Sequence, residues 1–380
     1  MRRQQNPMQT LPGRPPLWVN VVAVLGCFFA IFLIWRTNLT PPTDRTLLLV
    51  STQSTERVFA ALNARFEKEE FGQNGLRVHI TGSHGGNVIQ TTRVMSGEIE
   101  PDVVSMGLPS SVDQMRKANL VADDWETRPP GGAGAWYTTM VFLVRRGNPL
   151  QLRDWPDLVK MGVGLLVPDP AVMTQGQTSV IAAWGAVRAS GGSADDAEDF
   201  IRRLFRHTLY RVEDSRTLER IFVEEGEADV LLLREHDALA LRDAHPRDFE
   251  VVYPPVSLLV ESGVTWVDAH TQRHGTTALA KRYLEFLFSA GAQEIMARYG
   301  FRPTSDEVFA AHHARFPHIE LFPISRVAPS WSAAVQKFFG SGGLAEILYE
   351  TEVRKALPPA TLESEGNALR LTDRESPDGR

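Results

Sequence analysis

The sequence predicts an α/β protein that folds into two lobes behind an apolar N-terminal segment. Short apolar runs alternate along the chain with segments of helical periodicity, which is typical of buried strands in a parallel, doubly wound sheet. At 380 residues the chain is long enough for its hydrophobic core to divide into two. The apolar run Leu17–Trp35 precedes this body and has the length of a membrane span.

The N-terminal segment favours an uncleaved membrane anchor within residues 1–36. As a helix, Leu17–Trp35 would extend about 28 Å, close to the thickness of the hydrocarbon core. Arginines precede the run, so we expect the N-terminus to stay in the cytoplasm and the body to lie outside. Two alternatives remain open: a long cleaved signal peptide, and a lipoprotein site at Cys27. A short linker, residues 37–45, joins this segment to the body.

Charge and cysteine content exclude several classes of protein. Four arginines lie before Thr37, and the remainder carries 36 basic against 46 acidic residues, a formal charge of −10. An acidic body argues against nonspecific binding of nucleic acid. Cys27 is the only cysteine, so the body contains neither a disulfide nor a cysteine-ligated metal site.

The body is expected to alternate strands and helices, with a C-terminal third that is mainly helical. The final stretch, Pro358–Arg380, is polar and is expected to be disordered. Apolar runs predict strands at Thr46–Val50, Leu76–Ile80, Val103–Val104, Met140–Val144, Val163–Val167, Val230–Leu233 and Glu250–Tyr253. Periodic segments predict helices at Val58–Phe66, Asn87–Met95, Ser111–Lys117, Ser179–Ala189, Ala197–Phe205 and Leu218–Glu224.

A glycine-containing turn, Thr81–Asn87, joins one of these strands to a helix. Gly85 and Gly86 lack side chains, so the backbone at this helix start can approach a ligand closely. The amide groups there carry partial positive charge and form a ready anion site. A plain glycine-rich turn would give the same pattern, so the rest of the chain must decide between the two interpretations.

Eight segments, taken in order, are similar to segments of the prokaryotic sulfate- and thiosulfate-binding proteins, the extracytoplasmic receptors of an ABC importer. The resemblance extends over roughly residues 47 to 350. Its segments are Ser83–Gly86, Val141–Pro149, Asp154–Val159, Ala182–Gly185, Phe222–Gly226 with Asp229–Leu231, Tyr283–Ile295, Phe301–Pro303, and Phe316–Pro317 with Leu321–Phe322.

The resemblance implies a type II periplasmic-binding-protein fold, in which two lobes are joined by strands that cross twice. We expect the crossings near Trp136–Val144 and Val251–Val256. One lobe would comprise residues 46–136 and 254–345, and the other residues 137–253. The resemblance further implies a monomer without cofactor at the periplasmic or extracytoplasmic face of a bacterial membrane, which works with separate permease and ATPase subunits.

In this family, uncharged donors surround a buried sulfate, and the resemblance implies an equivalent site here with changed donors. Asn87 falls where the family has serine, and Met173 falls where it has a second serine. The family's ligand-binding tryptophan falls on Arg234. The candidate ligand-binding residues are Gly85, Gly86, Asn87, Thr174, Gln175, Arg216, Thr217, Leu218 and Arg234.

Arg234 is the largest of these changes and has two interpretations. A planar guanidinium offers a full charge and two parallel hydrogen bonds, which would retune the site toward another oxyanion: phosphate, a carboxylate, or an organic sulfonate or phosphonate. Alternatively, Arg234 pairs with Glu235, Asp237 or Asp214 and contacts no ligand.

No convincing catalytic or metal-binding set accompanies this site. His84 neighbours Ser83, but no nucleophile elbow surrounds the serine. His270 and His274 have a helical metal-ligand spacing without an evident third ligand, so we expect a solvated surface there. We therefore expect a receptor for sulfate or a related oxyanion and no enzyme. The alternative is a membrane-tethered sensor or scaffold that keeps the fold but has lost transport.

Overall fold

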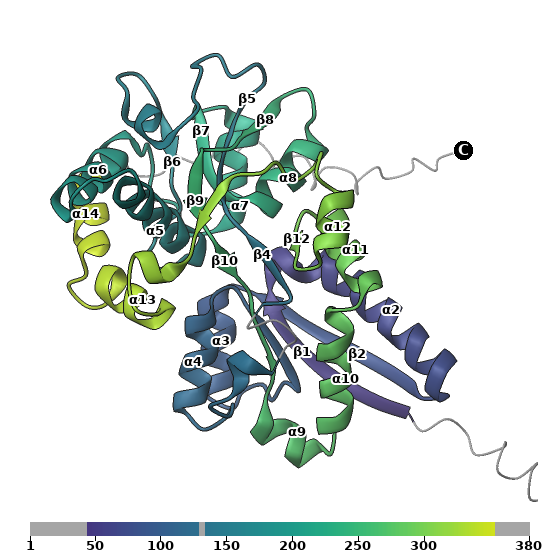
Figure 1. The fold of residues 1–380 in the computed structure, drawn as a ribbon. Helices are drawn as coiled ribbons and strands as arrows, with labels where there is room; N and C mark the ends of the chain where they lie inside the picture. The colour runs from purple at the N-terminus through teal and green to yellow at the C-terminus, as the bar shows by residue number, and fades with distance from the viewer. Residues whose placement is uncertain (1–43, 129–133, 354–380) are drawn as a thin grey trace, which may run out of the picture.

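Two four-stranded sheets organise residues 44–128 and 134–353, the part of the chain that the computed structural model describes (Figure 1). The predicted anchor and the polar tail 358–380 lie outside these residues. Asp44 and Arg45, expected in the linker, already belong to the first strand. None of the helices in the described part of the chain is long and apolar enough to span a membrane.

The first sheet has the order β11-β3-β1-β2, and helices cover both of its faces (Figure 1). Leu47 and Leu49 point to one face and pack with α2, α10 and α11, whereas Val50 points to the other, towards α3 and α4. This alternation follows from the two-residue period of a strand. The elements are β1 (Asp44–Thr52), β2 (Arg77–Gly85), β3 (Val103–Met106), β11 (Gly263–Trp266), α2 (Glu56–Asn74), α3 (Asn87–Met95), α4 (Pro109–Lys117), α9 (Asp268–His274), α10 (Thr277–Leu287) and α11 (Ala290–Arg298).

The second sheet has the order β6-β7-β5-β8 and is likewise covered on both faces. Phe142 faces α5 and α6, and Val141 and Leu143 face α7 and α8. The elements are β5 (Met140–Arg145), β6 (Leu165–Leu166), β7 (Val230–Arg234), β8 (Phe249–Val252), α5 (Thr174–Ala189), α6 (Ala194–His207), α7 (Ser215–Glu219), the π-helix η4 (Arg220–Glu225) and α8 (Glu235–Ala244).

Both sheets are mixed, which corrects the expectation of parallel sheets. β11 runs antiparallel to β3, and β5 runs antiparallel to both β7 and β8. The residues of β5 from Met140 to Val144 are buried, because helices cover the sheet on both sides. A strand buried on both faces has the same continuous apolar sequence in either direction, so its direction could not be deduced from that pattern.

Three segments, rather than the predicted two, pass between the lobes. The first runs through β4 (Trp136–Thr138) into β5, and the second through β9 (Val256–Leu258) and β10 (Val260–Glu261). The third runs from β12 (Arg302–Pro303) through α12 (Asp306–Ala311) to β13 (Glu320–Phe322). β4 pairs with β10 and β12, and β13 pairs with β9, so hydrogen bonds link the crossing segments.

The last helices pack on the second sheet's side of the molecule (Figure 1). α13 (Trp331–Phe339) and α14 (Leu344–Glu352) share a hydrophobic core with α5 and α6, in which Tyr349 lies against Phe205. This packing differs from the expected assignment of residues 254–345 to the first lobe. The reason is the third crossing segment, in which the chain returns after β12 to the side of the second sheet. The division of the chain between the lobes otherwise remains a proposal.

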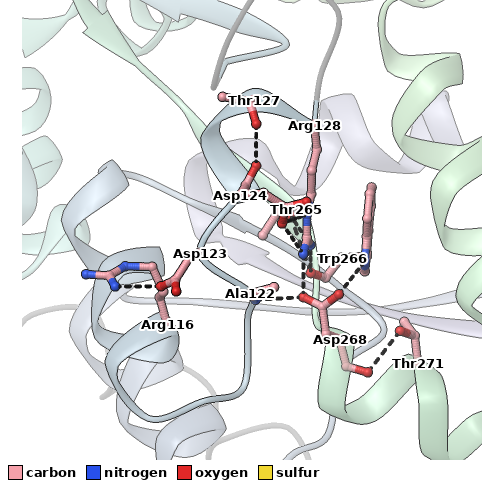
Figure 2. A network of polar contacts seen from close by, with 10 residues as sticks. All are labelled: Arg116, Ala122, Asp123, Asp124, Thr127, Arg128, Thr265, Trp266, Asp268 and Thr271. Atoms are coloured by element: carbon pink, nitrogen blue, oxygen red, sulfur yellow. Dashed lines mark hydrogen bonds and ion pairs between the residues drawn. The ribbon is translucent and has the colours of Figure 1, made fainter.

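A polar network fixes the loop before the first crossing (Figure 2). Arg128 Nη2 donates to Asp268 Oδ2 at 2.7 Å, and its guanidinium lies 4.1 Å from the centre of the Trp266 ring. Asp268 also accepts hydrogen bonds from the Ala122 amide and the Trp266 indole, at 2.8 and 2.9 Å. The carboxylate of Asp268 therefore joins the loop, β11 and α9.

Candidate functional site

Arg234 lies at the boundary of the two lobes. It is the last residue of β7 and immediately precedes α8, with an extended backbone. Only 6% of its surface is exposed, and its Nη2 donates to Thr174 Oγ1 at 2.8 Å. Thr174 is the first residue of α5, which has no side-chain cap. In the second lobe, the buried guanidinium of Arg234 therefore lies at the start of α5.

The first lobe approaches the same guanidinium through Gly107 and Asn87. A Cβ atom placed on Gly107 would lie 3.3 Å from Arg234 Nη1 and 3.4 Å from Asn87 Oδ1, so this close approach depends on the glycine. Asn87 Oδ1 accepts the Gly107 amide at 2.8 Å, and its Nδ2 donates to Ser111 Oγ at 2.9 Å. Asn87 begins α3, so the starts of α3 and α5 converge on Arg234.

No carboxylate within residues 44–128 and 134–353 lies within 4.0 Å of the Arg234 guanidinium. Its predicted alternative partners are otherwise engaged: Glu235 pairs with Arg302, and Asp214 accepts the Thr217 amide. Burial lowers the pKa of Arg234, and Asp237 opposes this only in part. A guanidinium nonetheless stays charged in proteins. The ion-pair alternative is therefore not realised, and the partial positive charge of two helix starts adds to a buried cation.

A small cavity of about 20 Å³, with a mixed polar and apolar lining, lies beside Arg234. Three of its lining residues carry a buried polar atom that has no hydrogen-bond partner among the described residues: Arg234 Nε, Ser105 Oγ and His236 Nε2. Unpartnered buried polar groups are costly, so such a cluster indicates a place for a bound polar group. The lining comprises Thr52, Thr55, Ser105, Met106, Gly107, Trp136, Thr138, Arg234, His236, Val260, Glu261, Ser262 and Phe301.

His236 is held rigidly at the edge of this cavity. Its ring stacks on Phe301, with centroids 4.2 Å apart, and its Nδ1 lies 3.2 Å from Thr138 Oγ1. Burial lowers the pKa of His236 to about 4, with Asp237 opposing this shift and Arg234 adding to it. The imidazole is therefore neutral at physiological pH and adds no charge to the site.

The structure brings some of the predicted site residues together. Asn87, Thr174 and Arg234 lie around one point, as described above. Gln175 follows Thr174, and its Nε2 is buried without a partner in the described structure. Gly85 ends β2, and Gly86 is the N-cap of α3, which also has no side-chain cap. Whether these residues contact a ligand remains a prediction.

The predicted residues of α7 lie in a different setting. Asp214 Oδ1 accepts the Thr217 amide at 2.9 Å, and the Asp214 carbonyl accepts the Leu218 amide, so this helix start is capped by the protein itself. Leu218 packs in the core of the second lobe, and Arg216 is exposed. Of all the predicted ligand-binding residues, Arg234 is the one that lines the cavity.

Sequence reasoning missed Ser105, Thr138 and His236. Ser105 is a polar residue near the carboxyl end of the apolar strand β3, where open α/β sheets commonly bind ligands, so a signal for it was present. Thr138 and His236 gave no comparable signal, because only the fold brings β4 and α8 together. The expected solvated surface at His270 and His274 is wrong for His270. This residue is buried on α9, and its Nδ1 lies 2.9 Å from the Pro101 carbonyl oxygen.

Comparison with known proteins identifies the family. A model of the bacterial extracellular solute-binding proteins matches residues 47–302. The chain belongs to this family. The sulfate-binding protein of Escherichia coli is 35% identical over 302 residues, covering 79% of this chain and 92% of that protein. The thiosulfate-binding protein of Pseudomonas aeruginosa is 33% identical over 305 residues, covering 80% and 92%.

A solved structure supports the same assignment. The sulfate-binding protein of Mycobacterium tuberculosis matches with a TM-score of 0.67 and 25% identity, covering 76% of this chain and 97% of that structure. The predicted resemblance to sulfate- and thiosulfate-binding proteins and the α/β periplasmic-binding-protein fold are confirmed. Family membership also confirms an extracellular solute-binding protein rather than an enzyme. The comparisons give no support to the alternative of a sensor or scaffold.

Proposed function

We propose that this solute-binding protein captures sulfate or a related tetrahedral oxyanion between its lobes and presents it to an ABC importer. The observation that carries the proposal is the Arg234 guanidinium, buried between the starts of α3 and α5 with an unpartnered Nε and no carboxylate within 4.0 Å in the described residues. A buried cation in this setting is costly until an anion compensates it.

The cavity beside Arg234 can take one oxygen of a ligand. Its volume of about 20 Å³ has room for about one water-sized group. The relatives bind sulfate or thiosulfate according to their names. The charge of Arg234 would replace the tryptophan N–H donor that the resemblance implies at this position.

The surrounding donors would complete the shell. Asn87 and the Gly85–Gly86 backbone would act from the first lobe, and Thr174 and Gln175 from the second. Hydrogen bonds between such donors and a charged ligand are worth about 1.5–3 kcal/mol each. We leave the start of α7 out of this shell, because Asp214 already accepts its amides.

The proposal extends to the partners and the location of the protein. The protein would act as a monomer with separate permease and ATPase subunits, tethered to the membrane by Leu17–Trp35. Supporting this, the apolar run has the length of a span, and the proteins of this family are extracellular.

A thermal-unfolding screen of the purified full-length chain tests the proposal. Sulfate, thiosulfate, phosphate and molybdate are added singly, and an anion at about 100 times its Kd should stabilise the chain by about 2.7 kcal/mol. Arg234→Met should abolish this stabilisation. Arg153→Met, which alters an exposed arginine, serves as the matched control and should preserve it. Equal stabilisation of both variants would refute a role for Arg234 in anion binding.

A further inference from the structure

We infer that Ser105 and His236 complete the anion site from its inner side and extend its ligand class to singly protonated oxyanions such as hydrogen phosphate. The inference rests on the proposed function and names two binding residues on opposite lobes. Both side chains line the cavity beside Arg234, and both present a buried polar atom without a partner in the described structure.

Ser105 lines the cavity from the first sheet. It belongs to β3, which pairs with β1 and β11, so its position is fixed by the sheet. Its residue surface is 1% exposed, yet its Oγ makes no hydrogen bond in the described structure. A buried hydroxyl without a partner in the described structure gains most if an oxygen of the anion enters the cavity, which has room for about one such group.

His236 faces the same cavity from the second lobe. Its ring position is set by Phe301 and Thr138, and the nearest carboxylate oxygen, Asp237 Oδ1, lies 3.5 Å from Nε2. The ring is neutral at physiological pH because burial lowers its pKa. A neutral imidazole nitrogen can donate or accept, depending on its tautomer.

This chemistry determines which anions the site tolerates. A shell that contains only donors rejects a protonated oxyanion, because the ligand's O–H would be left without an acceptor. A serine hydroxyl can donate to an unprotonated oxygen of sulfate or accept from the O–H of hydrogen phosphate. An oxygen placed between Ser105 and His236 is therefore satisfied in either protonation state, while Arg234 attracts both ligands by charge.

Calorimetric titration of the full-length chain tests the inference. Sodium sulfate and sodium phosphate are titrated at mildly alkaline pH into wild type, Ser105→Ala and Thr139→Val. Thr139 is the matched control, since its hydroxyl is also buried and unpartnered but does not line the cavity. We expect the two wild-type Kd values to agree within about tenfold, whereas an unsatisfied polar group can cost up to about 100-fold. Ser105→Ala should weaken both ligands by roughly 10- to 100-fold, and Thr139→Val should weaken neither.

The outcomes separate this inference from the proposed function. If wild type binds sulfate but binds phosphate more than about tenfold more weakly, the inference fails and sulfate binding stands. It also fails if Ser105→Ala behaves like Thr139→Val. If Ser105→Ala does not fold, Ser105→Cys replaces it, and the wild-type ratio still decides. Absence of binding by all oxyanions to wild type would instead refute the proposed function, and unchanged sulfate binding by Arg234→Met would place Arg234 outside the site.

Discussion

Glu235 and Arg302 form an ion pair that is almost completely buried. Arg302 Nε lies 2.5 Å from Glu235 Oε2, and Nη2 lies 2.9 Å from Oε1. Glu235 is the first residue of α8, directly after Arg234, and Arg302 lies in β12 among the crossing segments. The pair therefore ties the helix that follows Arg234 to the strands that join the lobes.

Breaking this pair on one side should destabilise the protein strongly. Arg302→Met leaves Glu235 buried without its counter-charge, so we expect a loss of about 3–5 kcal/mol in the free energy of unfolding. The double variant Glu235→Gln, Arg302→Met removes both charges and should recover part of the loss. Urea unfolding followed by circular dichroism measures both. A double variant less stable than Arg302→Met alone would contradict this account.

Replacing the buried cation by tryptophan should change selectivity. Arg234→Trp removes the charge and restores the residue type that the resemblance implies for sulfate binding. We expect weaker binding of phosphate and a higher ratio of sulfate to phosphate affinity, measured by calorimetric titration. Unchanged affinities for both anions would place Arg234 outside the site.

The exposed arginine of α7 should be dispensable for binding. Arg216→Met alters a predicted ligand residue that the structure places at the surface, beside a helix start capped by Asp214. We expect its anion affinity to equal that of wild type within error in the same titration. A tenfold or greater loss would show that α7 reaches the ligand in the bound form, and the predicted role of Arg216 would then be restored.

His236 should make the protein sensitive to acid. Its pKa is about 4 in the folded chain and about 6.5 when unfolded, so the unfolded state binds more protons between these values. Stability should therefore fall as pH decreases from about 6.5 to 4, by at most about 3 kcal/mol from this residue. His236→Phe, which keeps an aromatic ring against Phe301, should flatten the curve of unfolding free energy against pH in this window. Parallel curves for variant and wild type would contradict the assignment.

The network around Asp268 should support stability without affecting binding. Asp268→Ala removes the acceptor of the Ala122 amide, the Trp266 indole and the Arg128 guanidinium (Figure 2). Leaving these donors unsatisfied should cost about 2–3 kcal/mol in thermal unfolding. The anion affinity of the folded variant should match wild type, because this network does not line the cavity beside Arg234. A selective loss of affinity would reveal coupling between the two regions.

The sequence predicted the parts of the fold that depend on local pattern. The apolar run Thr46–Val50 lies within β1, and the glycine turn does lead into α3 at Asn87. The ordered resemblance also led to Arg234, which the structure places beside the cavity and next to Thr174 at the start of α5. These features are encoded by neighbouring residues, so they can be deduced without knowledge of distant contacts.

Features set by long-range pairing could not be deduced in the same way. Partners far along the chain determine the direction of β5, the third crossing, and the packing position of α13 and α14. Ser105 and His236 are 131 positions apart, and only the completed fold places both at one cavity. The residues at the start of α7 were placed in the site by the resemblance, and nothing in the sequence indicated that Asp214 would accept the Thr217 amide, so their role stays a prediction.

The three linked crossings constrain how this molecule can move. Rotation of one lobe around the axis of a single strand would shear the hydrogen bonds that join β4 to β10 and β12. Bending across all three segments leaves those bonds intact. The lobes should therefore move about a hinge that all three segments form together. A break in one segment would leave two others to hold the lobes in their relative positions.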